Sequence, residues 1–184
     1  MNLQPSTLSN EFVRLQPLVE SDFERLHEVA SDPLIWEQHP NPDRYKRKTF
    51  QIFFEGAMKS GSSFLVFDSQ TNQLIGSSRY YGHDETTSTV NIGYTFLARS
   101  HWGTNHNRAL KTVMLNYAFE FVDNVIFHIG AENIRSQKAI GKLGAIKIGE
   151  LEMPYYGEQT KLNFVHQIQR ENWISELFFR VIIP

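Results

Sequence analysis

The sequence predicts an α/β fold of the α+β kind, with a mixed, mostly antiparallel central sheet of about six to seven strands flanked by helices. Two helical segments precede three strand-like runs that short polar turns connect. Two strand-loop-helix units then follow in series. With 184 residues, 41% of them hydrophobic, the chain has the length and apolar content of one domain over residues 1–184.

The first third of the chain is expected to hold one strand and two helices. A strand over 12–17 is followed by a capping-box sequence that begins at Ser21, so a helix is expected over 21–30. A second helix over 47–59 repeats apolar residues on one face, and Gly61 is suited to end it.

The remaining strands are short runs of residues that favour β structure. The runs over 63–67 and 74–81 pair about a polar turn, and the run over 88–97 adds a third antiparallel strand. Further elements are strands over 125–129, 145–149 and 162–168, and a closing helix over 171–179. The apolar run from Leu177 to Ile183 is either a packed tail or a dimer contact.

The stretch from Arg99 to Asn107 joins the third of these strands to an amphipathic helix expected over 110–121. That helix is indicated by apolar residues at helical spacing: Leu110, Val113, Met114, Tyr117, Ala118 and Phe121. The free N–H groups and positive dipole end of such a helix form an anion site, so we expect a phosphorylated cofactor here. Arg108 and Lys111 either accompany that anion or form a solvated basic face. The stretch is neither a Walker A motif nor a dinucleotide-binding glycine motif, which disfavours nucleotide hydrolysis and hydride transfer.

A second strand-loop-helix unit follows. The strand over 125–129 leads to Ser136, a good N-cap for a helix whose apolar residues include Ile140 and Leu143. Gly144 suits the left-handed position that ends this helix. From these residues alone, Ser136 is simply that cap.

The order and spacing of these motifs resemble the Gcn5-related N-acetyltransferase superfamily, most closely its branch of ribosomal-protein N-terminal acetyltransferases. The matching residues are Ile92-Gly93-Tyr94, Trp102-Gly103, Ala118-Phe119, Asn133, Ser136, Lys142, Leu143 and Gly144. The resemblance covers most of the chain and implies the fold of that superfamily.

The resemblance also implies acetyl-CoA as the cofactor. Backbone N–H groups between Gly103 and Arg108 would hold the pyrophosphate, and the strand ending at Leu97 would pair with the pantetheine arm. Asn133 would bond that arm from the other side. The cofactor-binding residues expected on this basis are Phe96, Leu97, Trp102, Gly103, Thr104, Asn105, His106, Asn107, Arg108, Asn133 and Ser136.

Three positions depart from the pattern of the superfamily. Asn105 stands where a second glycine is usual in the phosphate loop, which leaves less room for a phosphate to approach. Ile140 stands where many members have a tyrosine that protonates the leaving thiolate, so Ser136 or a water is the remaining acid candidate. Asn91 replaces the glutamate that serves as general base in many members of this branch.

The expected catalytic positions are therefore Asn91, Ser136 and a substitute base. His83 is the candidate base, with Asp84 and His128 as alternatives, because a base that acts through water need only titrate near neutral pH. His83 and Asp84 are expected in a hairpin turn, and a buried core histidine is the alternative for His128. An acceptor amine that arrives neutral would need no base.

The acceptor side is expected to use residues from loops and from one strand. The resemblance places Trp36, Glu37, His39 and Tyr45 on one wall, and Tyr155 and Tyr156 on another, with core packing as the alternative for each aromatic residue. Arg79 either clamps a carboxylate or phosphate of the acceptor or lies on the solvated surface. A backbone N–H between Tyr94 and Leu97 would stabilise the oxyanion, so the substrate-binding set is Trp36, Arg79, Tyr94 and Tyr155.

These residues predict an N-acetyltransferase that transfers the acetyl group of acetyl-CoA to a primary amine by direct attack on the thioester. The amine is expected on a small molecule or on a protein N-terminus. The departures at Asn91, Asn105 and Ile140 motivate two alternatives. One is a noncatalytic acyl-CoA-binding module, and the other is an interaction domain with a degenerate site.

Composition limits the partners. The net charge of −2 gives no basic excess, so no nucleic-acid partner is expected. The absence of cysteine leaves no disulfide, thiol nucleophile or thiolate metal cluster; no metal is expected, and a cytoplasmic location is the default. No apolar run approaches the roughly 20 residues that span a bilayer, and the N-terminus lacks a signal-peptide pattern, so no membrane contact is expected. A monomer or homodimer is expected.

Overall fold

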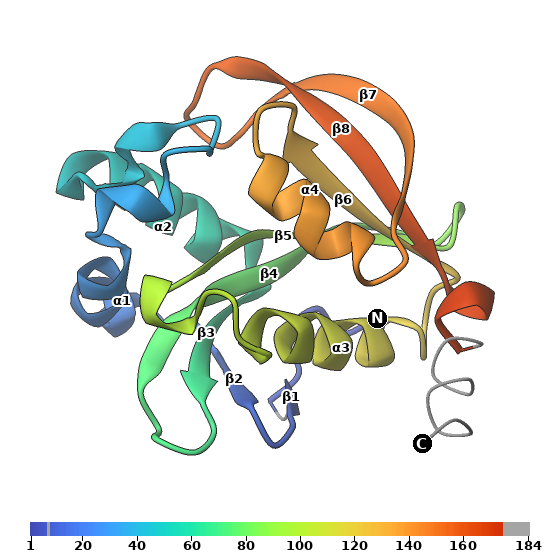
Figure 1. Ribbon diagram of the computed structural model, residues 1–184, viewed down its shortest axis with the longest axis horizontal. Coiled ribbons are helices and arrows are strands. Elements are labelled where there is room, and N and C mark those ends of the chain that lie inside the picture. The colour runs from blue at the N-terminus through green and yellow to red at the C-terminus, as the bar shows by residue number, and fades with distance from the viewer. Residues whose placement is uncertain (7, 175–184) are drawn as a thin grey trace.

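The computed structural model describes residues 1–6 and 8–174 and is built on one mixed eight-stranded sheet (Figure 1). The strands are β1 (Leu8–Ser9), β2 (Val13–Pro17), β3 (Ser63–Asp68), β4 (Leu74–Asp84), β5 (Thr89–Leu97), β6 (Asn124–Gly130), β7 (Ile146–Pro154) and β8 (Thr160–Gln169). Their order across the sheet is β1-β2-β3-β4-β5-β6-β8-β7, and every neighbouring pair is antiparallel except β5 and β6. The predicted fold class is confirmed, with one strand more than expected.

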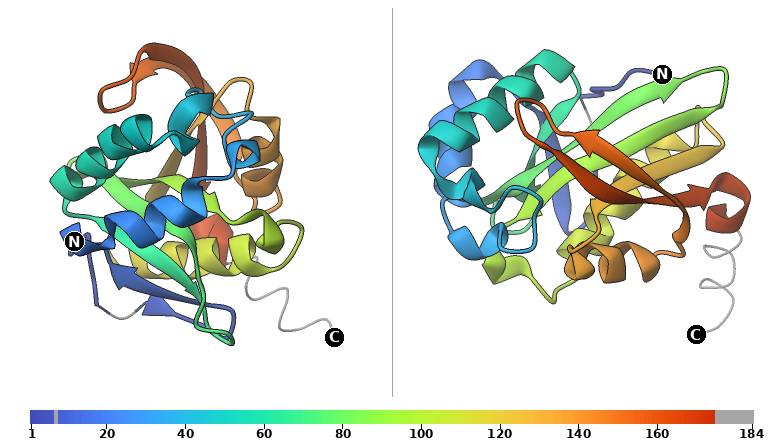
Figure 2. Two further views of the ribbon diagram at one scale, coloured as in Figure 1. Left: turned by 90° about the vertical axis from the view of Figure 1, so that its left-hand side faces the viewer. Right: turned by 90° about the horizontal axis from the view of Figure 1, so that it is seen from above.

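Helices cover both faces of this sheet. They are α1 (Phe23–Ala30), α2 (Arg47–Ser60), α3 (His106–Ala118) and α4 (Ile134–Gly141), joined by short 3-10 helices at 20–22, 33–35, 42–45 and 99–101. On one face, Phe50 and Phe53 of α2 form an aromatic core with α1. On the other face, Leu110 and Met114 of α3 pack with Ile140 of α4 against the strands. The right panel of Figure 2 shows the two pairs of helices on opposite sides of the sheet.

Strands β5 and β6 are hydrogen-bonded neighbours over only three residue pairs. Residues 89–91 pair with residues 124–126, and beyond this point the two strands diverge toward the left of Figure 1. A bulge bends β5 where the divergence begins, because Tyr94 and Thr95 together oppose Ser78 of β4. Tyr94 has the left-handed backbone of a residue inside such a bulge, with φ of 53°. The sheet therefore opens into a wedge between the C-terminal parts of β5 and β6.

Several elements differ from the prediction in number or extent. Strand β1, the additional strand, has two residues, which is too short to show an alternating pattern. Helix α3 begins at His106 instead of Leu110, because its first turn is polar and carries no apolar period. Strand β4 continues to Asp84, so the expected hairpin turn at His83 and Asp84 is wrong and the turn lies at residues 85–88.

Helix starts also differ from the prediction in which residue caps them. Ser21 lies inside a 3-10 helix, and the carboxylate of Asp22 instead accepts the backbone N–H of Val19 at 2.9 Å. Helix α2 and its left-handed end at Gly61, with φ of 58°, are confirmed.

The C-terminal elements are partly confirmed. Strands β7 and β8 exist but are longer than predicted, since they form an extended hairpin. The closing helix begins by residue 171, and its remainder lies outside the described residues, as does the apolar run from Leu177 to Ile183. Within the described part of the chain, no helix combines the length and apolar character needed to cross a bilayer.

Gly76 tests how closely β4 and β5 must approach. A Cβ at this position would meet the carbonyl oxygen of Phe96, so we expect Gly76→Ala to destabilise the protein by about 1–3 kcal/mol. Urea unfolding gives this difference in the free energy of unfolding. Gly149→Ala is the matched control, because a Cβ there meets nothing within 4 Å. Equal stabilities of the two variants would contradict the close approach.

Candidate active site

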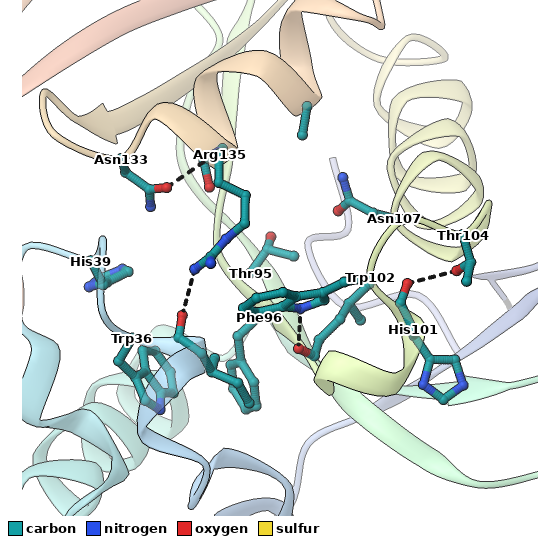
Figure 3. A pocket seen from close by; sticks show the side chains of 15 residues that line it. Trp36, His39, Thr95, Phe96, His101, Trp102, Thr104, Asn107, Asn133 and Arg135 are labelled. Atoms are coloured by element: carbon teal, nitrogen blue, oxygen red, sulfur yellow. Dashed lines mark hydrogen bonds between the residues drawn. The ribbon is translucent and has the colours of Figure 1, made fainter.

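A cavity of about 180 Å³ lies at the open end of the wedge. It is lined by Ile35, Trp36, His39, Thr95, Phe96, Leu97, His101, Trp102, Gly103, Thr104, Asn107, Asn133, Arg135, Ser136 and Ala139 (Figure 3). These residues come from the loop after α1, the end of β5, the start of α3 and the start of α4. The structure thus brings together most of the predicted cofactor-binding residues and, from the predicted acceptor set, Trp36.

The side chains of Trp102 and Arg135 contact each other at this cavity. The indole N–H of Trp102 donates to the carbonyl of Leu97 at 2.9 Å, which fixes the ring against the end of β5. The guanidinium of Arg135 lies 3.9 Å from the centre of that ring (Figure 3). Arg135 also donates to the carbonyl of Ile35 at 2.9 Å and forms an ion pair with Glu37 at 3.2 Å. These contacts tie α4 to the loop before α2 across the cavity.

Asn133 both caps helix α4 and faces the cavity. Its Oδ1 accepts the backbone N–H of Ser136 at 3.1 Å, so Asn133 is the N-cap and the prediction that Ser136 is the cap is wrong. The side chain of Asn133 is buried, and its Nδ2 has no hydrogen-bond partner among the described residues. An amide N–H is therefore left to donate into the cavity. Ser136 lines the cavity one helical turn away.

A second, larger cavity of about 630 Å³ adjoins the first where α3 and α4 begin. Four cationic side chains line it, and no carboxylate among the described residues does: the cations are Arg108, Arg135, Lys138 and Lys142. The first turn of α3 opens into the same space, so its free N–H groups add positive potential. Gly103 supplies the left-handed backbone of the loop, with φ of 73°, whereas Asn105 is right-handed, with φ of −76°. Asparagine in place of glycine therefore causes no backbone strain here.

The predicted cofactor residue His106 directs its ring to Asp68 instead of into either cavity. Its Nε2 lies 2.9 Å from Asp68 Oδ2, and His101 Nε2 lies 3.4 Å from the same oxygen. The Thr104 hydroxyl donates to the His101 carbonyl and lies 2.9 Å from His106 Nδ1. The contact between His106 and Asp68 fastens the start of α3 to the end of β3.

A third cavity of about 90 Å³ lies deeper in the wedge. Lys111 of α3 reaches it and donates to Thr95 Oγ1 at 2.6 Å, with its side chain buried. Burial lowers the pKa of Lys111 to about 7. The alternative of a solvated basic face is therefore wrong for Lys111. His128 lines the same cavity, where burial lowers its pKa, and its Nδ1 lies 3.1 Å from the Tyr81 hydroxyl.

Arg79 is buried, so the alternative of a solvated surface residue is wrong. Its guanidinium lies 3.4 Å from the centre of the Tyr94 ring and donates through Nη1 to the carbonyl of Gly56 at 2.7 Å. Burial lowers the pKa of Arg79 to about 10, and Nη2 has no partner among the described residues. Tyr155 contacts Tyr94 in a T-shaped arrangement, with ring centres 5.3 Å apart. The predicted acceptor residues Arg79, Tyr94 and Tyr155 thus form one cluster.

An ion pair beside this cluster was not predicted from the sequence. Arg44 is fully buried and binds Glu158 through two bonds of 2.6 and 2.8 Å. The pair joins the turn between β7 and β8 to the segment before α2, and Tyr156 in the same turn packs on Gly56 of α2. No local signal marks either partner, because they lie 114 positions apart in the sequence.

Asn91 and His83 do not reach any of the three cavities. The amide of Asn91 donates to the carbonyl of Tyr81 at 3.1 Å, within the pairing of β4 and β5. His83 lies in β4 between Tyr81 and Asp84, beside the part of β5 that pairs with β6 and away from the wedge. Their catalytic roles remain predictions that the arrangement of the cavities does not favour.

Residues 13–146 match the model of a protein family, the acetyltransferase (GNAT) domain. The chain belongs to this family. The predicted resemblance to Gcn5-related N-acetyltransferases is confirmed, and with it the enzyme class, an N-acetyltransferase. Members of the family use acetyl-CoA, which agrees with the predicted cofactor at the level of the family.

Solved structures of acetyltransferases share this fold. A GCN5-related N-acetyltransferase from Brucella melitensis has a TM-score of 0.76 at 17% identity, over 93% of this chain and 83% of that one. The spermidine N-acetyltransferase from Vibrio cholerae, in complex with CoA and spermine, has a TM-score of 0.64 at 18% identity, over 90% and 99%. A Vibrio cholerae protein named a ribosomal-protein-serine acetyltransferase has a TM-score of 0.68 at 15% identity, over 89% and 97%.

Asp68 gives a pH-dependent test of how the start of α3 is held. The N–H groups of Thr71 and Gln70, together with His106, hold the pKa of its carboxyl far below the usual range. The stabilisation is therefore present above about pH 4, the unfolded value, and is lost as the pH falls. We expect Asp68→Asn to lower the free energy of urea unfolding by about 1–2 kcal/mol at pH 7 and by less at pH 3.

Asp43→Asn is the control for the Asp68 experiment, because Asp43 is exposed and pairs only with the neighbouring Lys46. A difference between wild type and Asp68→Asn that stays constant from pH 7 to pH 3 would show that the carboxylate charge contributes nothing.

Proposed function

We propose that this N-acetyltransferase binds acetyl-CoA in the wedge between β5 and α4 and transfers the acetyl group to a primary amine by direct attack on the thioester. The observation that carries the proposal is the inner edge of β5, which β6 leaves unpaired beyond Asn91 and which faces the free Nδ2 of Asn133. An extended, amide-bearing arm fits between a strand edge and an amide donor.

The residues around the two outer cavities fit the whole cofactor. Acetyl-CoA supplies the activated acyl group and carries its negative charge on phosphates. Arg108, Lys138 and Lys142 surround the larger cavity beside the N-terminus of α3, which is where a phosphate group is held best. Trp102 and Arg135 enclose the narrower cavity that leads from there to the wedge. The positive charge of the larger cavity and the narrow shape of the smaller one therefore both fit acetyl-CoA.

Positioning is the main contribution of these residues. Trp102, fixed to Leu97, and Asn133, fixed as an N-cap, are rigid groups on opposite sides of the cavity. The bulge at Tyr94 turns the backbone of β5 into the wedge, where its N–H groups would stabilise the oxyanion. Groups fixed in this way lower the activation barrier, because the reactants have little translational and rotational freedom left to lose when they react.

The acceptor wall favours an amine that is not part of a polycation. Two buried guanidinium groups, Arg44 and Arg79, lie against the rings of Tyr155 and Tyr94, and the carboxylate of Glu158 is already bound to Arg44. The positive charge of Arg79, whose buried Nη2 has no partner among the described residues, would attract a carboxylate on the acceptor. We therefore infer an amino-acid-like amine or a peptide N-terminus as the acceptor class.

Asn133 variants test the cofactor site. Asn133→Asp and Asn133→Ser both keep an oxygen that can cap α4, and both remove the amide N–H. In calorimetric titrations with acetyl-CoA we expect affinity to fall about 5- to 30-fold, the value of one lost hydrogen bond. Affinity of the wild type should also fall as salt rises, because the larger cavity is cationic.

Asn172→Asp and Asn172→Ser are the matched controls, since this exposed amide bonds only Gln169. Saturable binding with unchanged affinity in both Asn133 variants would show that the Asn133 amide does not bind the cofactor. No binding by the wild type would overturn the proposed function.

Turnover on a panel of amines tests the transfer step and the acceptor class. We expect coenzyme A release with amino acids or peptides that have a free N-terminus, and none above hydrolysis with spermidine, because of the guanidinium groups near Tyr94. A thiol reagent follows the release without background, since the chain has no cysteine. Faster release with spermidine would contradict the acceptor class, and binding without turnover on any amine would indicate a noncatalytic module.

A further inference from the structure

Lys111 is a buried amine that nothing described above requires for binding. It projects from α3 into the wedge between β5 and β6 and lines the cavity of about 90 Å³ there. Its side chain is only 5% exposed, and its ammonium group donates to Thr95 Oγ1 at 2.6 Å. Burying a lysine without a counter-ion is costly, so an amine held in this way calls for an explanation.

No acidic group compensates this charge. Among the described residues, none that lines the cavity is a carboxylate, and Lys111 is in no ion pair. The titratable groups that line the cavity from the other elements are His39, Tyr94, His128 and Tyr155. Burial lowers the pKa of both histidines and raises that of Tyr155 to about 12, which keeps all three neutral. Helix α4 adds only uncharged residues. Burial alone therefore determines the pKa of Lys111, which it lowers to about 7.

The position of Lys111 relative to Ile140 indicates what the amine does. By the resemblance, Ile140 occupies the place where many members of the superfamily have a tyrosine that protonates the leaving thiolate, and an isoleucine side chain has no acidic proton. Ile140 and Lys111 line the same cavity, from α4 and α3 respectively. Thr95, which holds Lys111, and Ser136 line both this cavity and the one assigned to the pantetheine arm. An ammonium group is thus placed at the inner end of the proposed path.

We propose that Lys111 is the proton donor to the sulfur that leaves in the transfer reaction, in place of the absent tyrosine. The inference rests on the proposed function. When the acceptor nitrogen bonds to the carbonyl carbon, the C–S bond breaks and its electron pair passes to sulfur. An Nζ–H proton of Lys111 then moves to sulfur, which gives the free thiol. The neutral amine regains a proton from water, and the proton lost by the acceptor nitrogen passes to water, so no net proton is consumed.

Thr95 prepares Lys111 for this step. Its hydroxyl accepts from Lys111 and also contacts the Ser78 hydroxyl at 2.7 Å, so the ammonium is aimed at β5 by a fixed oxygen. Thr95 is one of the two residues in the bulge, which places the lysine beside the turned backbone of β5. Lys111 is the group that gives the proton, and Thr95 is its positioning residue.

The test measures the thiol of coenzyme A bound to the protein. Below about pH 7, where Lys111 carries its charge, an ammonium group beside that sulfur favours the thiolate, so we expect the thiolate fraction of the bound thiol there to be about tenfold higher in wild type than in Lys111→Met. The pH dependence of alkylation by iodoacetamide, followed by mass spectrometry, reports this ionisation. The cofactor thiol is the only thiol present, because the chain has no cysteine. The control is Lys48→Met, which removes an exposed lysine of α2.

The outcomes separate this inference from the proposed function. Saturable binding of coenzyme A with identical alkylation profiles for wild type and Lys111→Met would overturn the role of Lys111 and leave the binding site intact. Absence of coenzyme A binding by the wild type would overturn both. Alkylation below about pH 7 that is slower in Lys111→Met than in wild type, and unchanged in Lys48→Met, supports the inference.

A second measurement needs no variant and so does not depend on the folding of Lys111→Met. In wild-type protein with isotope-labelled lysine side chains, NMR should show one lysine that titrates near pH 7. We expect coenzyme A to shift this resonance and desulfo-coenzyme A, which differs only at sulfur, to shift it much less. Equal shifts with both ligands would place the sulfur away from Lys111 and overturn the inference.

Discussion

Three residue pairs hold β5 and β6 together, and the position of each site residue follows from where that pairing ends. If the parallel ladder continued, the carbonyl and N–H groups along β5 would be consumed by β6, and Lys111 would have no cavity to enter. The bulge at Tyr94 and Thr95 sets the point of divergence. Two separate cores, one on each face, hold the divided sheet in this shape. The wedge is thus a consequence of packing on both sides, and the site depends on it.

Parallel pairing also explains why the charged groups gather at one end. Each of the two parallel strands leads into a helix, so α3 and α4 begin at the same edge of the sheet. These two helices bring Arg108, Arg135 and Lys138 to one cavity although no basic run exists in the sequence. The Asp68–His106 pair then fixes the start of α3, and the Asn133 cap fixes the start of α4. Local capping chemistry and sheet topology together form the anion site.

Local patterns predicted the elements better than they predicted the contacts of the site. Apolar period identified α2, and turn chemistry identified the left-handed ends at Gly61 and Gly144. The same patterns misplaced the start of α3, because a polar first turn looks like a loop. The resemblance to the superfamily implied a cofactor-binding role for Trp102 and Asn133, and both line the same cavity. A solvated basic face was one of the two alternatives for Lys111, because the sequence around a lysine does not show which strand its side chain will contact. Arg44 and Glu158 gave no signal, since their pairing depends on the tertiary fold.

The unpaired edges in this sheet also bear on self-association. An open strand edge commonly recruits other chains, which leads to aggregation. Here the open stretches of β5 and β6 face each other inside the molecule, beside the crossing of Trp102 and Arg135. The outer edges are protected in other ways, since β1 has two residues and β7 carries Lys147, Glu150 and Pro154. The unpaired backbone groups of β5 and β6 therefore remain available to one narrow ligand, while the strands of neighbouring polypeptides cannot reach them to pair.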